Sequence, residues 1–324
     1  MCGLFGFSDP KHVLNLKQMK RLTSALATAS EERGTDASGI AYVHGHTIRI
    51  FKRPRAAHTM PWMIPVHTTT VMGHTRMATQ GNAKFNRNNH PFPGQCGQAA
   101  FALAHNGVLR NEGQLRKKFH LPKTGVETDS YAAVQLLEQE THLDAQSICR
   151  MAERLEGTFA LSILDQFNNL YLVKGNNPLC ICRFENGLLC YASTSSILKE
   201  ALGGLDFLPK QKEIVSLSEG DVLCVRADGR MQMTEFDTSK ICHLYYLWDI
   251  DGPLYGWYQG GSGSINAHAT PLDILLETAG NMGFLPEDIL LMLEEGYCEE
   301  EIESLLNTPG AFYTALMELY GVAY

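Results

Sequence analysis

The sequence predicts an α+β fold in which antiparallel sheets are layered with helices, followed by a small helical appendage. Three observations support this prediction. Short apolar or alternating runs cluster along the chain, which is typical of antiparallel strands. Helical patterns occur in consecutive pairs rather than singly after each strand, which argues against a doubly wound parallel sheet. Residues 265–324 instead show three or four short helical patterns.

The expected strands are short runs of apolar and β-branched residues. Asn168-Asn169 and Asn186-Gly187 are expected to form hairpin turns between them. Cys180 and Cys182 also stand in a strand-like run, and we interpret them as small core residues rather than as metal ligands. The other strands are expected at Leu4–Phe7, Gly39–Val43, Ile48–Phe51, Thr69–His74, Ala100–His105, Phe159–Asp165, Leu170–Val173, Leu188–Ala192 and Val222–Val225.

The expected helices follow apolar spacing of three and four residues. In the appendage, Pro271 and Pro286 stand at first-turn positions with acidic residues after them. An apolar stripe near the end of the chain predicts one buried helix face, formed by Ala311, Phe312, Ala315, Leu316, Leu319 and Tyr320. The earlier helices are expected at His12–Ser30, Glu112–Phe119, Asp129–Glu140, Ala145–Leu155 and Ser196–Leu202.

A charge asymmetry divides the chain near residue 240. Residues 1–240 carry 27 Lys and Arg against 22 Asp and Glu, whereas residues 241–324 carry no Lys or Arg and 13 Asp and Glu. The second part begins with an aromatic-rich stretch and the sequence QGGSGS, which is typical of a flexible linker. We therefore expect a main domain at residues 2–240, an aromatic and Gly/Ser segment at 241–264, and an acidic helical appendage at 265–324. The acidic end argues against nucleic-acid binding.

The composition is that of an ordinary globular protein, with 44% hydrophobic and 19% charged residues. No run of about 18 apolar residues occurs, so we expect no membrane span. The N-terminus lacks a signal-peptide pattern, so we expect a cytoplasmic protein whose nine cysteines form no disulfides. Because the sequence shows no Walker loop and no dinucleotide fingerprint, we expect no cofactor and no metal.

Cys2 is the first candidate catalytic residue, because initiator Met is normally removed when the next residue is small. A chain that begins with Cys carries a nucleophile and a base in one residue. Its α-amine has an ordinary pKa of about 7.7 to 8.0, so a neutral fraction can accept the thiol proton. Taken alone, Cys2 is better explained as an ordinary residue of an N-terminal strand.

Six segments in order give this cysteine a context, because together they resemble class II glutamine amidotransferases. They are CGLFGF (2–7), ERGTDASG (32–39), GHTRMAT (73–79), NHPF (89–92), HNG (105–107) and ETD (127–129). The resemblance covers about residues 2–230. Glutamine phosphoribosylpyrophosphate amidotransferase and glucosamine-6-phosphate synthase are examples of enzymes whose N-terminal domain it resembles. It implies a four-layer αββα N-terminal-nucleophile hydrolase sandwich. It also implies an enzyme that hydrolyses L-glutamine through a γ-glutamyl thioester on Cys2.

The resemblance assigns the main chemical roles to four residues. The tetrahedral oxyanion needs preset donors, and these roles go to the side-chain amide of Asn106 and the backbone N–H of Gly107. Arg76 is assigned to the α-carboxylate of glutamine, which suits its planar fork. Asp129 is assigned to the α-ammonium group. Asn106-Gly107 is also compatible with a hairpin turn, and Asp129 with a helix cap.

Three further residues receive supporting roles from the resemblance. Arg33 is expected near the nucleophile, although it is also compatible with an ordinary surface position. Thr79 and His90 are expected in the loop that covers bound glutamine, although His90-Pro91 is also compatible with a simple loop turn. Two residues depart from the family pattern. Met77 stands where related enzymes often carry the Trp or Tyr that helps to close the site and steer ammonia, and Gln80 differs from the His of one subfamily.

Three functional hypotheses follow. In the first, which we favour, ammonia passes to a separate synthase, because residues 241–324 are too few for the synthase domain of the long family members. In the second, the protein is a stand-alone hydrolase of another γ-glutamyl compound, which needs nearly the same site. In the third, it is an inactive binding scaffold, but Cys2, Asn106 and Asp129 are all present. The acidic tail is expected either to dock the synthase or to pack on the basic body of the enzyme.

Overall fold

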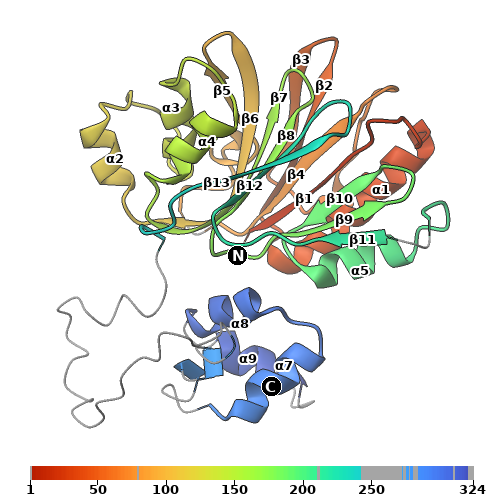
Figure 1. Ribbon diagram of the computed structural model, residues 1–324, viewed down its shortest axis with the longest axis vertical. Helices are drawn as coiled ribbons and strands as arrows, with labels where there is room; N and C mark the ends of the chain where they lie inside the picture. Colours follow the sequence, from red (N-terminus) through yellow and green to blue (C-terminus); the bar gives the residue numbers. More distant parts are fainter. Residues whose placement is uncertain are drawn as a thin grey trace. The chain divides into compact units, whose positions relative to one another are not determined.

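A computed structural model of the chain describes residues 2–78, 80–209, 212–241, 272, 275–276, 278–279, 284–308 and 311–319. The chain divides into two compact units, Met1–Ile241 and Cys242–Tyr324, which are drawn in Figure 1. Several expectations fall outside the described residues: the aromatic stretch and Gly/Ser linker, Pro271, Tyr320 and the candidate site residue Thr79.

The first unit contains two sheets, and all pairings between their named strands are antiparallel. The seven-stranded sheet has the order β11-β9-β10-β1-β4-β2-β3, and the six-stranded sheet has the order β13-β12-β8-β7-β6-β5. The strands are β1 (Gly3–Ser8), β2 (Ala37–His44), β3 (Thr47–Arg53), β4 (Thr70–Arg76), β5 (Phe92–Cys96), β6 (Ala99–Leu109), β7 (Gly157–Asp165), β8 (Leu170–Lys174), β9 (Cys180–Phe184), β10 (Leu189–Ala192), β11 (Lys212–Val215), β12 (Asp221–Val225) and β13 (Met231–Glu235).

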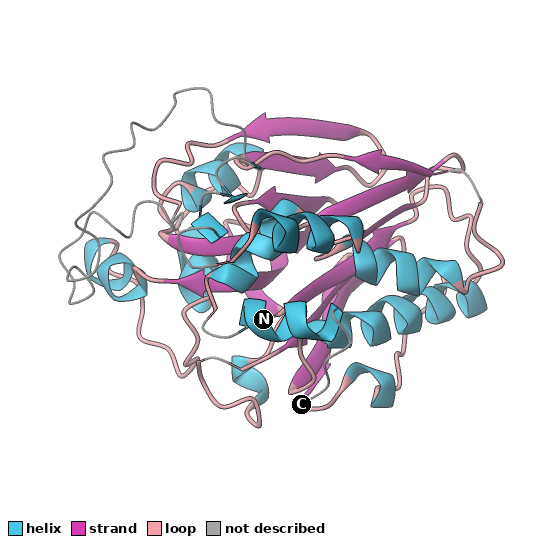
Figure 2. Ribbon diagram, turned by 90° about the horizontal axis from the view of Figure 1, so that it is seen from below, coloured by secondary structure: helices cyan, strands magenta, loops and turns pink. Residues whose placement is uncertain are grey.

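The helices of this unit lie outside the strands, as Figures 1 and 2 show. Two of them pack on the seven-stranded sheet and three on the six-stranded sheet. The first group is α1 (Leu16–Ala29) and α5 (Ser195–Gly203), and the second is α2 (Glu112–Lys118), α3 (Tyr131–Glu138) and α4 (Ala145–Ala152). Short 3₁₀ turns occur at η1 (Ser30–Arg33), η2 (Ala57–Thr59) and η3 (Asn86–Asn88).

Three hydrophobic clusters separate these layers, so the unit has the four-layer αββα arrangement that the sequence predicts. One cluster lies between the seven-stranded sheet and α1 and α5, and a second lies between the six-stranded sheet and α2, α3 and α4. A third lies between the two sheets. In β1, Phe5 and Phe7 belong to the helix-side cluster while Leu4 belongs to the cluster between the sheets. This is the two-residue periodicity of a strand buried on both faces.

The nine strands for which the sequence gave bounds all appear in the structure. The strand-like run that contains Cys180 and Cys182 also appears, as β9. Three strands that the sequence did not reveal, β5, β11 and β13, each lie at an edge of a sheet. Edge strands have one unpaired side and tolerate residues such as Pro93 and Gly94 in β5. Their apolar pattern is therefore weak, which explains why they were missed.

The five expected helices also appear, but α1 begins later than predicted. Asn15 caps it: the Asn15 side chain accepts from the N–H of Gln18 at 3.0 Å, and the Gln18 side chain accepts from the N–H of Asn15 at 2.9 Å. His12 has a positive φ of 51° and stands before the helix. The capping box, rather than the first apolar residue, therefore fixes where the helix starts.

The second unit is helical in its described residues, with α7 (Pro286–Glu294), α8 (Glu299–Leu306) and α9 (Ala311–Leu319). Pro286 occupies a first-turn position of α7, as expected. Phe312 and Leu316, from the predicted stripe, are buried in the unit's own core together with Ile289 and Ile302. The stripe is thus used in internal packing. Among the described helices, none has both the length and the apolar character to cross a membrane.

Candidate active site

Cys2 lies immediately before β1, and two groups hold it. The Nε of Arg33 donates to the carbonyl of Cys2 at 3.1 Å, and the Sγ of Cys2 donates to the carbonyl of Met77 at 3.5 Å. Burial raises the pKa of the Cys2 thiol, while the positive charges of Arg76 and Arg33 oppose that rise. The thiol therefore stays protonated at neutral pH until a base removes its proton.

Arg76 ends β4 and is buried, with 3% of its surface exposed. Its Nη1 donates to Oδ1 of Asn89 at 2.7 Å, and its Nη2 donates to the carbonyls of Gln80 and Gly81. Burial lowers the pKa of Arg76, whereas the charges of Cys2, Asp36 and Asp129 raise it. The charges of Cys2, Asp36 and Asp129 therefore act on the guanidinium, while its own hydrogen bonds hold the loop that follows β4.

Asp129 lies just before α3, and its carboxylate faces β6 rather than capping the helix. Its Oδ2 accepts from the N–H of Leu109 at 2.6 Å, and its Oδ1 accepts from the hydroxyl of Ser130 at 3.3 Å. Its own N–H donates to the side chain of Gln80 at 3.3 Å. Gln80 therefore contacts both Arg76 and Asp129, and the two residues expected to bind the head group of glutamine are linked through one loop residue.

Asn106 and Gly107 lie next to each other in β6. Asn106 is completely buried, and neither Nδ2 nor Oδ1 of its side chain has a hydrogen-bond partner among the described residues. Gly107 has a φ of 143°, and a Cβ there would stand 1.9 Å from the carbonyl oxygen of Thr158. Only glycine fits this position. A buried amide without partners is costly, so it is a candidate for binding a group that arrives with substrate.

Three histidines near these residues, His74, His90 and His105, are buried. The Nε2 of His74 contacts the carbonyl of His105 at 3.0 Å, so that this nitrogen carries the proton and connects β4 to β6 across the two sheets. Burial lowers the pKa of His74 to about 3 and also lowers the pKa of His90 and of His105. The buried ring of His90 packs at a tilt against His74 and Phe92. The distance between ring centroids is 4.1 Å to His74 and 4.4 Å to Phe92. The histidines are neutral packing groups at pH 7.

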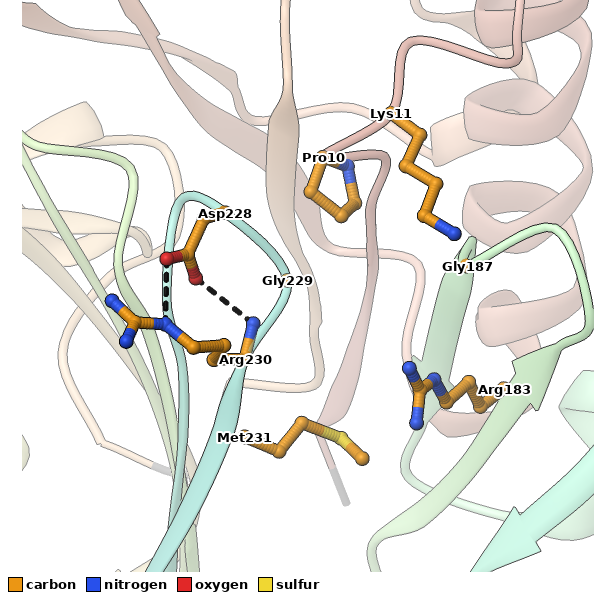
Figure 3. Close-up of a pocket in the computed structure, with 8 residues that line it drawn as sticks. All are labelled: Pro10, Lys11, Arg183, Gly187, Asp228, Gly229, Arg230 and Met231. Carbon is orange, nitrogen blue, oxygen red and sulfur yellow. Dashed lines mark hydrogen bonds and ion pairs between the residues drawn. The ribbon is translucent and has the colours of Figure 1, made fainter.

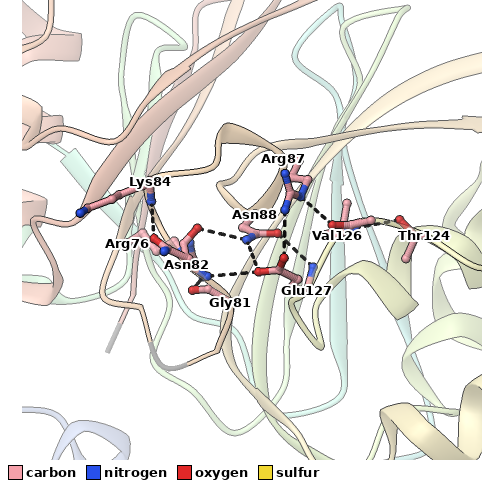
Figure 4. A network of polar contacts seen from close by, with 10 residues as sticks. Arg76, Gly81, Asn82, Lys84, Arg87, Asn88, Thr124, Val126 and Glu127 are labelled. Atoms are coloured by element: carbon pink, nitrogen blue, oxygen red, sulfur yellow. Dashed lines mark hydrogen bonds and ion pairs between the residues drawn. The ribbon is translucent and has the colours of Figure 1, made fainter.

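A polar network holds the loop between β4 and β5 against the segment before α3, as Figure 4 shows. Glu127 is its centre: its Oε1 accepts from Arg87 at 3.0 Å, and its Oε2 accepts from the side chain of Asn88 at 2.9 Å. The N–H of Glu127 donates back to Oδ1 of Asn88 at 3.0 Å. Since Asp129 follows two residues later, the network fixes the loop relative to this carboxylate.

Sequence analysis gave no role to Asn89, Lys52 or Asp36, although all three support Arg76. Lys52 donates to the carbonyls of Asn89 and Pro91, and Asn89 in turn accepts from Arg76. Burial lowers the pKa of Lys52 to about 8. Asp36 donates its N–H to the carbonyl of Arg76 at 2.9 Å and accepts from the N–H of Ala78 at 2.7 Å. These contacts join segments that are distant in sequence. Asp36 and Asn89 stand within segments that carry the family resemblance, but no local pattern indicates that they contact Arg76.

A pocket of about 490 Å³ lies elsewhere in the first unit, as Figure 3 shows. Its lining is Pro10, Lys11, Arg183, Gly187, Asp228, Gly229, Arg230 and Met231. Pro10 follows the end of β1, whereas Cys2 precedes its start, so the two are separated by the length of a six-residue strand, roughly 20 Å. The described lining contains none of the candidate site residues and no Cys, Ser or Thr, so we do not take this pocket as the candidate active site.

Comparison with known proteins agrees with this fold and this set of residues. A family model described as class-II glutamine amidotransferases matches residues 1–166, which is more than half of the chain. The chain belongs to the class II glutamine amidotransferases. It therefore has the amidotransferase domain of an enzyme family, as its sequence predicts.

Its relatives include glutamine–fructose-6-phosphate aminotransferases (isomerizing). The protein of Listeria monocytogenes is 28% identical over 302 residues, covering 86% of this chain and 48% of the relative. That of Halalkalibacterium halodurans is 29% identical over 255 residues, covering 74% of this chain and 40% of the relative. The chain thus spans about half the length of these relatives or less.

A solved structure has the same fold. Glutamine phosphoribosylpyrophosphate amidotransferase from B. subtilis, complexed with ADP and GMP, superposes with a TM-score of 0.60 at 20% identity. The match covers 76% of this chain and 52% of that chain. The structural likeness supports the N-terminal-nucleophile hydrolase sandwich.

Proposed function

We propose that the protein hydrolyses the side-chain amide of L-glutamine and that Cys2, freed by removal of Met1, is the nucleophile. The α-amine of Cys2 takes the thiol proton, and the thiolate attacks the amide carbon. The resulting oxyanion accepts hydrogen bonds from the side chain of Asn106 and the N–H of Gly107. Collapse expels ammonia, which takes the proton from the α-ammonium, and leaves a γ-glutamyl thioester. Water then hydrolyses the thioester to release glutamate.

The observation that carries this proposal is the buried amide of Asn106, which has no partner among the described residues. In the proposed complex its Nδ2 gains the developing oxyanion as an acceptor. The energetic cost of the unsatisfied donor then falls as the reaction reaches its transition state, and this difference is what lowers the barrier. The raised pKa of Cys2 also fits the proposal, because a protonated thiol needs the base that a free α-amine supplies.

For recognition, we propose that Arg76 binds the α-carboxylate and Asp129 the α-ammonium of glutamine. Both side chains are nearly buried, and the charge of Asp129 acts on Arg76. The present partners of Arg76 are two loop carbonyls and an amide oxygen, and those of the Asp129 carboxylate are one backbone N–H and a hydroxyl. None of these partners is charged, so both side chains can act on the opposite charges of a zwitterionic head group. We assign Arg33 to holding Cys2 through its carbonyl, and Thr79 and His90 to the loop over the substrate, as the resemblance implies.

We further propose that the ammonia is received by a separate synthase that binds residues 241–324. This part of the chain has 13 acidic residues and no Lys or Arg, and its described helices have a core of their own. Because Phe312 and Leu316 are buried in that core, the contact would use the acidic exterior and exposed apolar residues such as Leu285, which is 62% exposed. Ammonia is quickly protonated in water, so the acceptor must bind closely.

The proposal is tested by intact mass measurement and active-site labelling of the native protein. The mature chain should lack Met1, and a diazo-ketone analogue of glutamine should alkylate Cys2 in preference to other thiols. Burial raises the pKa of Cys96 and of Cys149 to about 11, so these thiols are neutral at pH 7 and provide an internal background. Cys2→Ser should lose most glutamine hydrolysis, whereas Cys298→Ser, in the second unit, should keep it.

Three results would contradict the proposal, the third only in its choice of substrate. Full activity in a preparation that retains Met1 would exclude the α-amine as base. Equal labelling of Cys2 and Cys96 would show that no glutamine site directs the reagent. If another γ-glutamyl compound were hydrolysed and glutamine were not, the assignment of Cys2 as nucleophile would be kept, but the assignment of glutamine as substrate would be wrong.

A further inference from the structure

The two proposed oxyanion donors come from one short segment of β6. The carbonyl of Asn106 and the N–H of Gly107 belong to the same planar, trans peptide unit, in which the two groups point in opposite directions. Any contact that fixes this carbonyl therefore fixes the direction of the N–H. The angle at which the Gly107 N–H meets an oxyanion is thus set by whatever holds the carbonyl of Asn106.

Asn177 makes that contact. Its Nδ2 donates to the carbonyl oxygen of Asn106 at 2.9 Å, and Asn177 is 5% exposed. The same amide nitrogen also lies against Gly107, because a Cβ on Gly107 would stand 2.8 Å from it. Asn177 is therefore in contact with both residues that flank the peptide unit.

Asn177 is itself fixed by β7. Its backbone N–H donates to the carbonyl of Phe159 at 3.3 Å, and Oδ1 of the preceding Asn176 accepts from the N–H of Phe159 at 3.1 Å. Phe159 is the residue opposite Gly107 in the β6–β7 register. The Asn176-Asn177 pair thus holds the strand next to the oxyanion segment as well as the peptide unit itself.

We propose that Asn177 is a positioning residue, which orients the N–H of Gly107 for the oxyanion through the carbonyl of Asn106. The inference rests on the proposed glutamine hydrolysis and adds to it a residue that acts through the peptide unit and touches no substrate. Without the Asn177 bond, the peptide unit is held by the β6–β7 pairing alone, and a small tilt of the unit moves the N–H out of line with the oxyanion. Misplacement of a catalytic group by about 1 Å can cost roughly 10²-fold in rate.

The test compares substitutions at Asn177 in steady-state glutamine hydrolysis. Asn177→Asp has the same shape but directs an acceptor at the carbonyl of Asn106, so kcat should fall by roughly 10- to 100-fold with little change in KM. Asn177→Ala removes the bond without adding repulsion and should lower kcat less. The matched control is Asn186→Asp in the β9–β10 hairpin, where the carboxylate can still accept from the N–H of Leu188. It should behave as wild type.

A double-mutant cycle separates positioning from mere stability. If Asn177 acts through the oxyanion segment, Asn106→Ala and Asn177→Ala together should cost less in kcat than the product of their separate effects. Additive effects on kcat would overturn the inference. So would variants that change only KM and thermal stability and leave kcat unchanged. Asn177→Ser provides a second variant if the aspartate variant does not fold.

The inference and the proposed function fail in different ways. If Asn106→Ala lowers kcat while all Asn177 variants keep it, only the inference is wrong. If wild-type protein does not hydrolyse glutamine, or if Asn106→Ala leaves kcat unchanged, the proposed function fails and the inference fails with it.

Discussion

The replacement of Asn106 by Leu should make the protein more stable and less active. Leu has nearly the same shape as Asn, and Asn106 is completely buried with neither side-chain polar atom paired among the described residues. A buried polar group without a partner costs about 1–3 kcal/mol. Removing that cost should raise the free energy of unfolding of the first unit by about 1–3 kcal/mol. Loss of one oxyanion donor should lower kcat by roughly 10²–10³.

Urea denaturation followed by circular dichroism measures the first effect, as a higher midpoint at an unchanged slope. Thermal unfolding should shift upward by roughly 2–4 °C for each kcal/mol, given a unit of this size. Asn111→Leu is the matched control. Asn111 is also buried, but its Nδ2 donates to the carbonyl of Arg154 at 2.9 Å and its Oδ1 accepts from the N–H of Glu156 at 3.2 Å. The same substitution there should destabilise the protein.

Two outcomes would refute this reasoning. If Asn106→Leu destabilised the protein as Asn111→Leu does, the amide of Asn106 would already be satisfied in the free enzyme. If Asn106→Leu stabilised the protein but left kcat unchanged, the amide would not bind the oxyanion. A rise in KM alone would instead assign Asn106 to ground-state binding.

Three further predictions concern the loop, the buried histidines and the tail. Glu127→Gln should raise KM modestly and spare kcat, because it weakens the network that holds the loop near Asp129; steady-state kinetics in which kcat alone falls would contradict this. The neutral state of His74, whose pKa is lowered to about 3, should contribute stability that is fully present above about pH 6.5, the ordinary histidine pKa, and is lost as pH falls toward 3, because the unfolded chain binds the proton there. The free energy of unfolding from urea denaturation should therefore fall by up to about 1.4 kcal/mol per pH unit for this residue, and a flat profile between pH 6.5 and 5 would count against the burial argument. Truncation after Gln259 should leave glutamine hydrolysis intact while abolishing salt-sensitive, glutamine-dependent synthesis with the acceptor enzyme, and unfolding of the shortened protein would show that the tail is structural.

The sequence predicted those parts of the fold that depend on local pattern. Interior strands such as β1 and β7 are mostly apolar, and α1 and α5 have clear amphipathic spacing, so each was recognisable alone. The edge strands β11 and β13 lack such a pattern because one side of each remains unpaired. The pairing order of the strands was also beyond local pattern, since β1 pairs with β4 and β10 rather than with its neighbours in sequence.

For the candidate site, the sequence indicated residues within recognisable segments but not the residues that hold them. Arg76 and Asn106 stand in short motifs, and their types suggest their chemistry. Asn177 lies 71 residues from the carbonyl it binds, and Lys52 lies 37 residues from Asn89. A single Asn in a loop or a single Lys in a strand has no distinguishing pattern, so only the folded geometry reveals these contacts.

The proposed chemistry depends on the packing of the two sheets against each other. Cys2 precedes β1 and Arg76 ends β4, both strands of the seven-stranded sheet, whereas Asn106 belongs to β6 of the other sheet. The layer between the sheets includes small side chains such as Ala102 and Ala104, which precede the oxyanion segment on β6. Small residues there let the sheets approach closely, and the contact of His74 with β6 fixes their offset. The distance between nucleophile and oxyanion donors is thus a property of core packing, and activity should respond to substitutions between the sheets that never touch the substrate.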